Sequence, residues 1–341
     1  MTETQRIGQL FAVGLADDHL SPDTVSAIQA YHFGSVHFIV TTSVGVAGIR
    51  AVTSAVQSLA SPDTTGGVRF FIAANQEGGE IQALQGAGFS RMPSALDQGS
   101  LPTARLDGLA TRWGRELADA GVNVDFAPVM DVVPPGTDGE NRPIGALDRE
   151  FGHDPATVAA HGVAFLRGME RAGIIPTAKH FPGLGRVQGN TDFAAGVTDS
   201  VTTANDPYLA TFREAIDSGI PFVMVALATY TRIDPTNMAV FSPVVIRELL
   251  HGTMHFEGVV VSDDLGSSVQ VANIPPGERA ERFLEAGGDL IVSKTVPTAI
   301  EMYGPVLARA QSDESFRRLV DHAALRILRA KEATGLLPCT D

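Results

Sequence analysis

The chain has 341 residues, 44% of them hydrophobic, and a formal net charge of −14 at pH 7. This acidic balance argues against a nucleic-acid partner and against a polybasic membrane-binding surface, because both need clustered lysine and arginine. A chain of this length can bury a large core, and α/β barrels of this size fold as one domain.

Short apolar runs rich in valine, isoleucine and phenylalanine alternate with longer stretches of helical periodicity. Continuous apolar strands between helices predict a parallel sheet that is covered by helices. In chain order, the predicted strands are Phe11–Leu15, Ser35–Ile39, Arg69–Ala73, Val122–Ala127, Ile175–Ala178, Phe222–Ala226, Gly258–Ser262 and Asp289–Ser293. The predicted helices include Ala104–Ala120, Pro155–Ala172, Asp206–Ser218, Pro243–His251, Glu278–Ala286, Thr298–Ala310 and a last one at about Asp313–Thr334.

About eight strand–helix units in a chain of this length favour a closed (β/α)8 TIM barrel, an α/β fold, over an open doubly wound sheet. The sequence contains no linker, low-complexity tract or change of composition. We therefore expect residues 1–341 to form a single barrel domain.

The cysteine content and the apolar stretches of the chain indicate the cellular compartment that we expect. Cys339 is the only cysteine, so a disulfide framework and a cysteine metal site are excluded. The apolar stretch 7–15 lacks the basic flank and the small-residue cleavage site of a signal peptide, and a first barrel strand explains it better. No run approaches the roughly 18 apolar residues of a membrane span. We expect a cytoplasmic protein, with an exported form as the alternative if a leader once preceded Met1.

Polar residues that directly follow the apolar runs are the candidates for an active site, because barrel enzymes place their sites at the carboxyl ends of the strands. They are Asn75, Gln76 and Glu77 after the third run, Asp131 after the fourth, Lys179 and His180 after the fifth, and Asp263 and Asp264 after the seventh. Each alone could be a buried structural group. Several at one barrel mouth indicate a site.

The segment from Lys179 to Gly185 reads Lys-His-Phe-Pro-Gly-Leu-Gly, and Asn-Thr-Asp follows at 190–192. Lysine and histidine can donate hydrogen bonds to sugar hydroxyls, and the glycines allow the backbone to approach a ligand closely. This segment resembles the Lys-His-Phe-Pro-Gly-x-Gly signature of glycoside hydrolase family 3, in its NagZ-type branch of single-domain β-N-acetylglucosaminidases of peptidoglycan recycling.

The resemblance covers nearly the whole chain. Ile7–Phe11 matches the family's opening, Gln76–Gly79 its third-strand loop, Val122–Asp131 its Val-Asn-x-Asp-x-x-Pro-Val-x-Asp stretch, Asp148–Gly152 its Asp-Arg-x-Phe-Gly motif, and Ser262–Leu265 its nucleophile segment. It implies a retaining exo-β-N-acetylglucosaminidase that hydrolyses terminal β-linked N-acetylglucosamine from muropeptides or chitooligosaccharides.

The resemblance implies that Asp263 is the nucleophile. Retaining glycosidases need one carboxylate to attack the anomeric carbon, and the end of an apolar strand holds a carboxylate rigidly for that step. The alternative is that Asp263 or Asp264 caps the next helix, since aspartate is a favoured N-cap. We assign attack to Asp263 and local support to Asp264.

The sugar-binding residues implied by the resemblance are Lys179, His180 and Arg149, with Asp131 as a further sugar-binding or supporting residue. For Arg149 the alternative is an ion pair with a loop neighbour, Asp148 or Glu150. Asn75 stands where the family usually has a sugar-binding aspartate. Asparagine keeps an acceptor oxygen but loses the charge, which predicts weaker binding or altered selectivity.

The general acid/base departs from the family pattern. NagZ-type enzymes carry Asp-Ser-His on the loop after the Lys-His segment, and the histidine protonates the leaving oxygen. Here Asp192 stands at the histidine position and Asn190 at the aspartate position. Asp192 can serve as the acid/base if burial or Asp263 raises its pKa; the alternative is a plain turn residue. An ionised Asp192 would repel phosphate and so favour hydrolysis over phosphorolysis.

Metal and nucleotide motifs are absent from the sequence. There is no HExxH, CxxC or P-loop pattern, and the spacing of His37, His153, His251 and His255 does not indicate a metal cluster. We therefore expect no metal and no cofactor. Two further hypotheses stay open: another β-glycosidase or a glycoside phosphorylase, and a catalytically decayed sugar-binding barrel, which the missing loop histidine and Asn75 motivate.

Overall fold

The eight predicted apolar runs form one parallel sheet in the computed structural model, which describes residues 1–16 and 18–337; Cys339 lies outside these residues. The strands are β1 (Phe11–Leu15), β2 (Ser35–Phe38), β3 (Phe71–Ala74), β6 (Val124–Asp125), β7 (Ile175–Phe181), β9 (Phe222–Val225), β11 (Val259–Ser262) and β12 (Ile291–Ser293). Every residue of these strands is buried, which explains why they read as continuous apolar runs rather than as alternating patterns.

The sheet closes on itself. Its strand order is β11, β9, β7, β6, β3, β2, β1 and β12, with all neighbours parallel. A parallel bridge between Val261 and Leu290 joins the two ends, and the Ser262 amide donates to the Leu290 carbonyl at 2.9 Å. The predicted (β/α)8 TIM barrel is confirmed.

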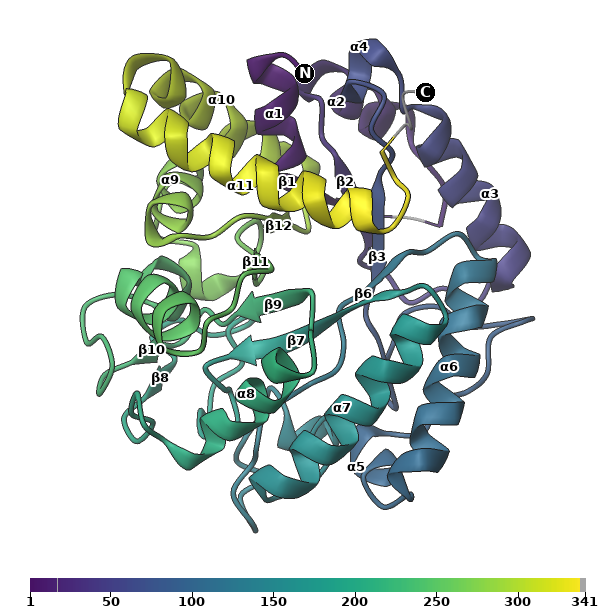
Figure 1. Cartoon of the computed structure of the whole chain (residues 1–341), viewed down its shortest axis with the longest axis vertical. Helices are drawn as coiled ribbons and strands as arrows, with labels where there is room; N and C mark the ends of the chain where they lie inside the picture. Colours follow the sequence, from purple (N-terminus) through teal and green to yellow (C-terminus); the bar gives the residue numbers. More distant parts are fainter. Residues whose placement is uncertain (17, 338–341) are drawn as a thin grey trace.

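Helices surround the barrel (Figure 1). The helices that follow the eight strands are, in chain order, α2 (Pro22–Tyr31), α3 (Gly45–Ser58), α6 (Thr103–Asp119), α7 (Pro155–Arg171), α8 (Ala210–Asp217), η4 (Val244–Thr253), α9 (Pro276–Ala286) and α10 (Val296–Ser312). The remaining elements are α1 (Glu3–Gln9), α4 (Pro62–Thr65), α5 (Ala95–Gln98), α11 (Glu314–Ala333), η1 (Gly145–Leu147), η2 (Pro207–Leu209), η3 (Ala239–Phe241) and η5 (Val269–Val271), with the short pairs β4 (Gln76–Gly78) and β5 (Ile81–Gln82), and β8 (Thr198–Asp199) and β10 (Thr229–Tyr230).

Helices α6 and α7, on the outside of the barrel, pack closely against each other. A Cβ atom on Gly114 would lie 2.6 Å from that of Ala172, and one on Gly168 would lie 2.5 Å from that of Ala110. Larger side chains would therefore force the helices apart.

The N-cap residue Asp154 accepts a hydrogen bond from the amide of Thr157, which fixes the residue at which α7 begins.

Strand β7 continues beyond its predicted end at Ala178 and includes Lys179 and His180. The amide of Met130 donates to the Lys179 carbonyl at 2.7 Å, so the segment after β6 pairs with this extension. Sequence patterns placed the strand end at the first polar residues. Here buried tertiary partners satisfy those polar side chains, so the strand can continue.

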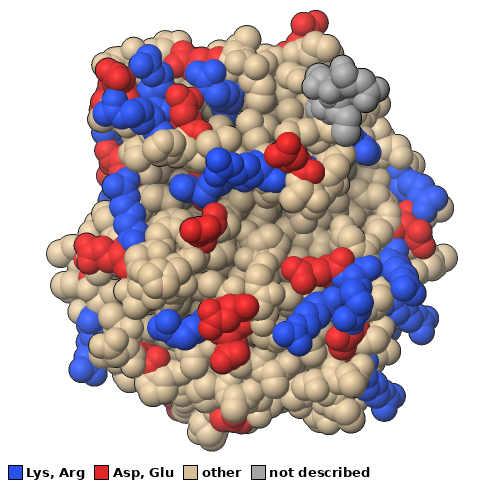
Figure 2. Space-filling model, viewed as in Figure 1, with Lys and Arg blue, Asp and Glu red and all other residues tan. Residues whose placement is uncertain are grey.

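The described residues include no helix that is both long enough and apolar enough to cross a bilayer. On the face shown in Figure 2, basic and acidic side chains are interspersed, and uncharged residues cover most of the area. Neither sign of charge dominates a broad part of this face.

Candidate active site

A cavity of about 320 Å³ lies where the predicted site residues meet. Six of the seven predicted residues line it: Asn75, Arg149, Lys179, His180, Asp192 and Asp263. The seventh, Asp131, is fully buried and contacts His180. The strand-end argument selected Asn75, Asp131, Lys179, His180 and Asp263, and the family resemblance added Arg149 and Asp192. The barrel brings these side chains together although they are spread over nearly 190 positions of sequence, from 75 to 263.

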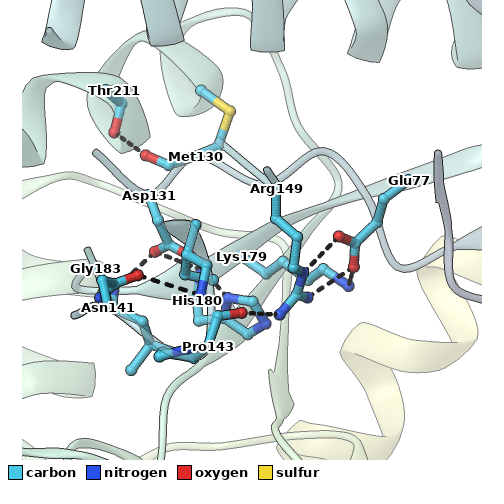
Figure 3. Close-up of polar contacts among 12 residues, drawn as sticks. Glu77, Met130, Asp131, Asn141, Pro143, Arg149, Lys179, His180, Gly183 and Thr211 are labelled. Carbon is cyan, nitrogen blue, oxygen red and sulfur yellow. Dashed lines mark hydrogen bonds and ion pairs between the residues drawn. The ribbon is translucent and has the colours of Figure 1, made fainter. Parts of the chain in front are cut away.

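Glu77 binds both cations of the sugar-binding set (Figure 3). Arg149 donates to its two carboxylate oxygens at 2.8 Å each, and the Lys179 ammonium lies 2.5 Å from Oε1. Burial opposes ionisation of Glu77, but the charges of Arg149 and Lys179 outweigh it and lower the pKa of this carboxyl to about 2. The side chain is therefore a carboxylate at any physiological pH and fixes both cations.

Two further acceptors orient these cations. Arg149 donates to the Pro143 carbonyl at 2.7 Å (Figure 3). Lys179 donates to Oδ1 of Asn75 at 2.9 Å. The ion pair of Arg149 is therefore with Glu77, from the third-strand loop, and not with Asp148 or Glu150. The amide oxygen of Asn75 thus accepts a hydrogen bond from the Lys179 ammonium.

Asp131 holds the His180 ring in one orientation. Its Oδ2 accepts from Nδ1 of His180 at 2.8 Å, and its Oδ1 accepts from the amides of His180 and Leu184 at 3.1 and 2.9 Å. A carboxylate at Nδ1 favours the tautomer with the proton on that nitrogen. The structure thus places Asp131 behind the histidine, in a supporting position.

Asp263 occupies the carboxyl end of β11. Its amide donates to the Val225 carbonyl of β9 at 3.0 Å, which ties the backbone to the sheet, and its Oδ1 accepts from the Asp264 amide at 2.8 Å. Burial raises the pKa of Asp263, and the nearby Asp192 carboxylate adds to this, whereas His180 and Lys294 lower it. Burial outweighs the lowering contributions, so the pKa of Asp263 lies above its ordinary value of 3.8.

Asp264 organises the turn after Asp263. Its Oδ1 accepts from the amides of Gly266 and Lys294, both at 2.9 Å, and its Oδ2 accepts from the hydroxyl and amide of Ser267. Both carboxylate oxygens thus accept hydrogen bonds, from donors in the same turn and from the residue after β12. They match the supporting role that we assigned to Asp264.

Asp192 is bound to a cation from the last strand loop. Its Oδ2 lies 2.9 Å from Nζ of Lys294, and its Oδ1 accepts from the hydroxyl of Ser268 at 2.8 Å. Burial would raise the pKa of Asp192, but the Lys294 charge outweighs it and lowers that pKa. In addition, Oδ1 of Asn190 accepts from the Asp192 amide at 3.0 Å, which is the expected turn geometry. The raised pKa that the sequence analysis required of Asp192 is therefore wrong, because Lys294 binds its carboxylate. Its catalytic role stays a prediction.

The comparison with known families decides the identity of this barrel. Residues 2–330 match the model of the glycosyl hydrolase family 3 N terminal domain. The chain belongs to glycosyl hydrolase family 3. It is a glycoside hydrolase, as the resemblance of its motifs to this family implied.

Several family 3 relatives are similar over most of their length. The chain is 34% identical to a beta-hexosaminidase of Stenotrophomonas maltophilia over 273 residues, which cover 74% of this chain and 76% of that protein. It is 27% identical to the beta-hexosaminidase LpqI of Mycobacterium tuberculosis, covering 97% of this chain and 83% of that one. The crystal structure of a beta-N-acetylhexosaminidase from Beutenbergia cavernae superposes with a TM-score of 0.96 at 45% identity, covering 97% and 99% of the two chains.

Lys294 and His37 are among the cavity residues of this family 3 enzyme that the sequence did not assign to the site. Lys294 directly follows β12, so the strand-end rule applied to the last strand would have found it. His37 lies within β2, where a strand residue gives no such signal. Its side chain is 2% exposed, and neither ring nitrogen has a hydrogen-bond partner among the described residues. Burial lowers the pKa of His37 to about 4, so the ring is neutral at physiological pH.

Proposed function

We propose that this family 3 glycoside hydrolase is a retaining exo-β-N-acetylglucosaminidase that releases terminal β-linked N-acetylglucosamine from muropeptides or chitooligosaccharides. The observation that carries the proposal is the position of Asp263, whose carboxylate shares one cavity with the donors of Lys179, His180 and Arg149. The hexosaminidase names of the relatives support the choice of sugar.

The size of the cavity supports exo action. A volume of about 320 Å³ is at the small end of the range for ligand pockets. It suits one terminal sugar whose hydroxyls accept hydrogen bonds from Lys179, Arg149 and Nε2 of His180. Glu77 and Asp131 hold these donors from behind, so they are oriented before the sugar arrives.

The reaction requires two displacements at the anomeric carbon. In the first, an Asp263 oxygen forms a bond to this carbon while the bond to the leaving oxygen breaks, and the acid delivers a proton to that oxygen. In the second, water attacks the glycosyl ester, its proton passes to the same residue, and Asp263 leaves as a carboxylate. Both displacements together give retention of configuration.

We assign the acid/base role to Asp192. Its ion pair with Lys294 keeps it ionised, which suits the base half of the cycle, when it takes a proton from water. For the acid half it must first bind a proton. We expect Asp192→Ala to slow turnover sharply and azide to restore part of the rate, because azide can attack the glycosyl ester without a base. An unchanged rate would remove Asp192 from the mechanism.

The covalent step is tested with 4-nitrophenyl β-N-acetylglucosaminide. Wild type releases nitrophenol, and Asp263→Asn lowers kcat/KM by at least about 10³-fold, whereas Asp97→Asn, at an exposed position outside the cavity, does not. Intact mass spectrometry of Asp192→Ala during turnover should detect one N-acetylglucosaminyl adduct, which is absent when Asp263 is also replaced.

Two outcomes would contradict this proposal. If the product formed in the presence of inorganic phosphate is N-acetylglucosamine 1-phosphate, phosphate replaces water in the second displacement and the enzyme is a phosphorylase. If wild type and Asp263→Asn are equally inert but both bind N-acetylglucosamine, the barrel is a sugar-binding protein.

A further inference from the structure

A second group of polar side chains lies on the loop between β6 and α7, outside the lining of the cavity. It consists of Asp138, Glu150 and His153, and one ligand atom from each lies within 4.8 Å of the other two. Nδ1 of His153 is 3.4 Å from Oδ1 of Asp138 and 3.3 Å from the carbonyl of Val133. Asp138 and His153 are fifteen positions apart in the sequence, so residue spacing alone could not reveal the group.

Glycine brings the two halves of this loop together. A Cβ atom on Gly145 would lie 2.7 Å from Cα of Asp138, closer than any real side chain allows. Because Gly145 has no side chain, the backbone at Asp138 packs directly against η1. The backbone at Asp138 is thus held close to the segment that leads to Glu150 and His153.

Glu150 is the unusual member of the group. It has no exposed surface, and neither of its carboxylate oxygens has a hydrogen-bond partner among the described residues. Oδ1 of Asp138 likewise has none. A buried carboxylate without donors is strongly disfavoured, and a second carboxylate beside it adds repulsion. The pair needs either a shared proton or a bound cation.

The surroundings favour a cation. The side chains of Asp138 and His153 are 35% and 34% exposed, so solvent reaches the group from one side while Glu150 forms its base. Two carboxylates and an imidazole are a ligand set for a divalent first-row transition ion, since imidazole is a poor ligand for magnesium. The carbonyl oxygen of Val133, 3.3 Å from Nδ1 of His153, is close enough to be a fourth ligand atom.

We propose that Asp138, Glu150 and His153 bind one Zn²⁺ ion. The ion would tie position 138 to positions 150 and 153 and so brace the loop that carries Arg149. Its role would be structural, because none of its three ligands lines the cavity in which Asp263 lies.

Isothermal titration calorimetry of the full-length, tag-free protein with ZnCl2 tests this site. Wild type should bind one Zn²⁺ per chain, with MgCl2 giving no heat. Glu150→Gln should weaken binding by at least about tenfold, which is the lower end of what losing even an outer partner of a metal ligand costs. Glu140→Gln is the matched control: it removes the same charge from an exposed side chain of the same loop and should bind Zn²⁺ as wild type does.

Thermal unfolding gives a second readout. Zn²⁺ should raise the Tm of wild type and of Glu140→Gln but not that of Glu150→Gln. If Glu150→Gln does not fold, His153→Gln replaces it, because that side chain is one-third exposed and its loss leaves no buried gap. Equal Zn²⁺ affinity in wild type and both ligand variants would place the ion elsewhere and overturn the proposal. Absence of binding to wild type would leave a shared proton between the carboxylates and would also overturn it.

Discussion

Glu77 is a carboxylate with almost no exposed surface, held between the cations of Arg149 and Lys179. In the folded protein its pKa is about 2, below the ordinary value of 4.5. Folding lowers this pKa, so the carboxylate stabilises the native state above pH 4.5, and this stabilisation is lost as the pH falls towards 2. The difference corresponds to about 3 kcal/mol, similar to the cost of breaking a buried ion pair elsewhere.

Glu77→Gln should therefore lower the free energy of unfolding by about 3 kcal/mol at pH 7. The deficit relative to wild type should be smaller at about pH 3.5, because at this pH Glu77 is protonated in the unfolded wild-type chain but not in the folded one. Urea unfolding at the two pH values measures both quantities. Glu80→Gln, at a nearby exposed acidic position, should change stability by less than about 0.5 kcal/mol. An equal deficit at both pH values would show that charge is not the cause.

Residue patterns predicted several polar residues of the cavity but not the partners that hold them. Asp263, Lys179 and His180 could be selected because each follows or ends an apolar run. The pairings of Arg149 with Glu77 and of His180 with Asp131 span 72 and 49 positions, and only the closed barrel brings those residues together. For the same reason, the sequence suggested the neighbours Asp148 and Glu150 as alternative ion-pair partners of Arg149, and this alternative was wrong.

At the scale of elements, the apolar runs located all eight barrel strands, because strands buried on both faces need continuous apolar sequence. The ends of the strands were less accurate. β7 extends through Phe181 since Glu77 and Asp131 compensate its polar residues, and β6 is reduced to Val124 and Asp125. Where a strand ends at the barrel mouth depends on tertiary partners of its polar residues, and these partners, such as Glu77 and Asp131, also orient the residues of the site.

The loop that carries Asp192 also presents Phe193, whose side chain is 80% exposed and lines the cavity. An aromatic ring at a cavity mouth can cover the apolar face of the sugar or aglycone next to the scissile bond. Phe193→Ala should therefore lower kcat/KM for N,N′-diacetylchitobiose about tenfold, the effect of losing roughly 1.4 kcal/mol of apolar contact. The free energy of unfolding should not change, because the ring is already in solvent.

Val201→Ala is the control for Phe193→Ala, since Val201 is 52% exposed and does not line the cavity. Its kcat/KM should equal that of wild type. An equal loss of activity in both variants would indicate a general effect on the loops. Wild-type activity in Phe193→Ala would exclude contact between this ring and the substrate.

At the scale of the whole molecule, the C-terminal helix α11 inserts a lysine into the core. Lys331 is fully buried, and its Nζ lies 2.7 Å from both Oε1 of Gln9 and the carbonyl oxygen of Gly34. No carboxylate pairs with it among the described residues, and burial holds its pKa well below the ordinary value of 10.5. The last helix is thereby joined to the segments that precede β1 and β2.

This burial has a pH dependence with a definite sign. Between the lowered pKa of Lys331 and 10.5, the unfolded chain binds a proton that the folded chain does not, so stability rises with pH in that range. Lys331→Met removes this titration. The free energy of unfolding of wild type minus that of the variant should therefore increase with pH, by up to about 1.4 kcal/mol per pH unit, and level off near 10.5.

Denaturant unfolding between neutral pH and about pH 10.5 measures this difference. Arg329→Met on the same helix is the control, because it removes an exposed cation that does not titrate in the range, and its difference from wild type should stay constant. A constant difference for Lys331→Met as well would mean that Lys331 remains charged in the folded protein. In that case, its two oxygen acceptors and the ring of Phe71, 4.9 Å away, would have to stabilise a buried ammonium.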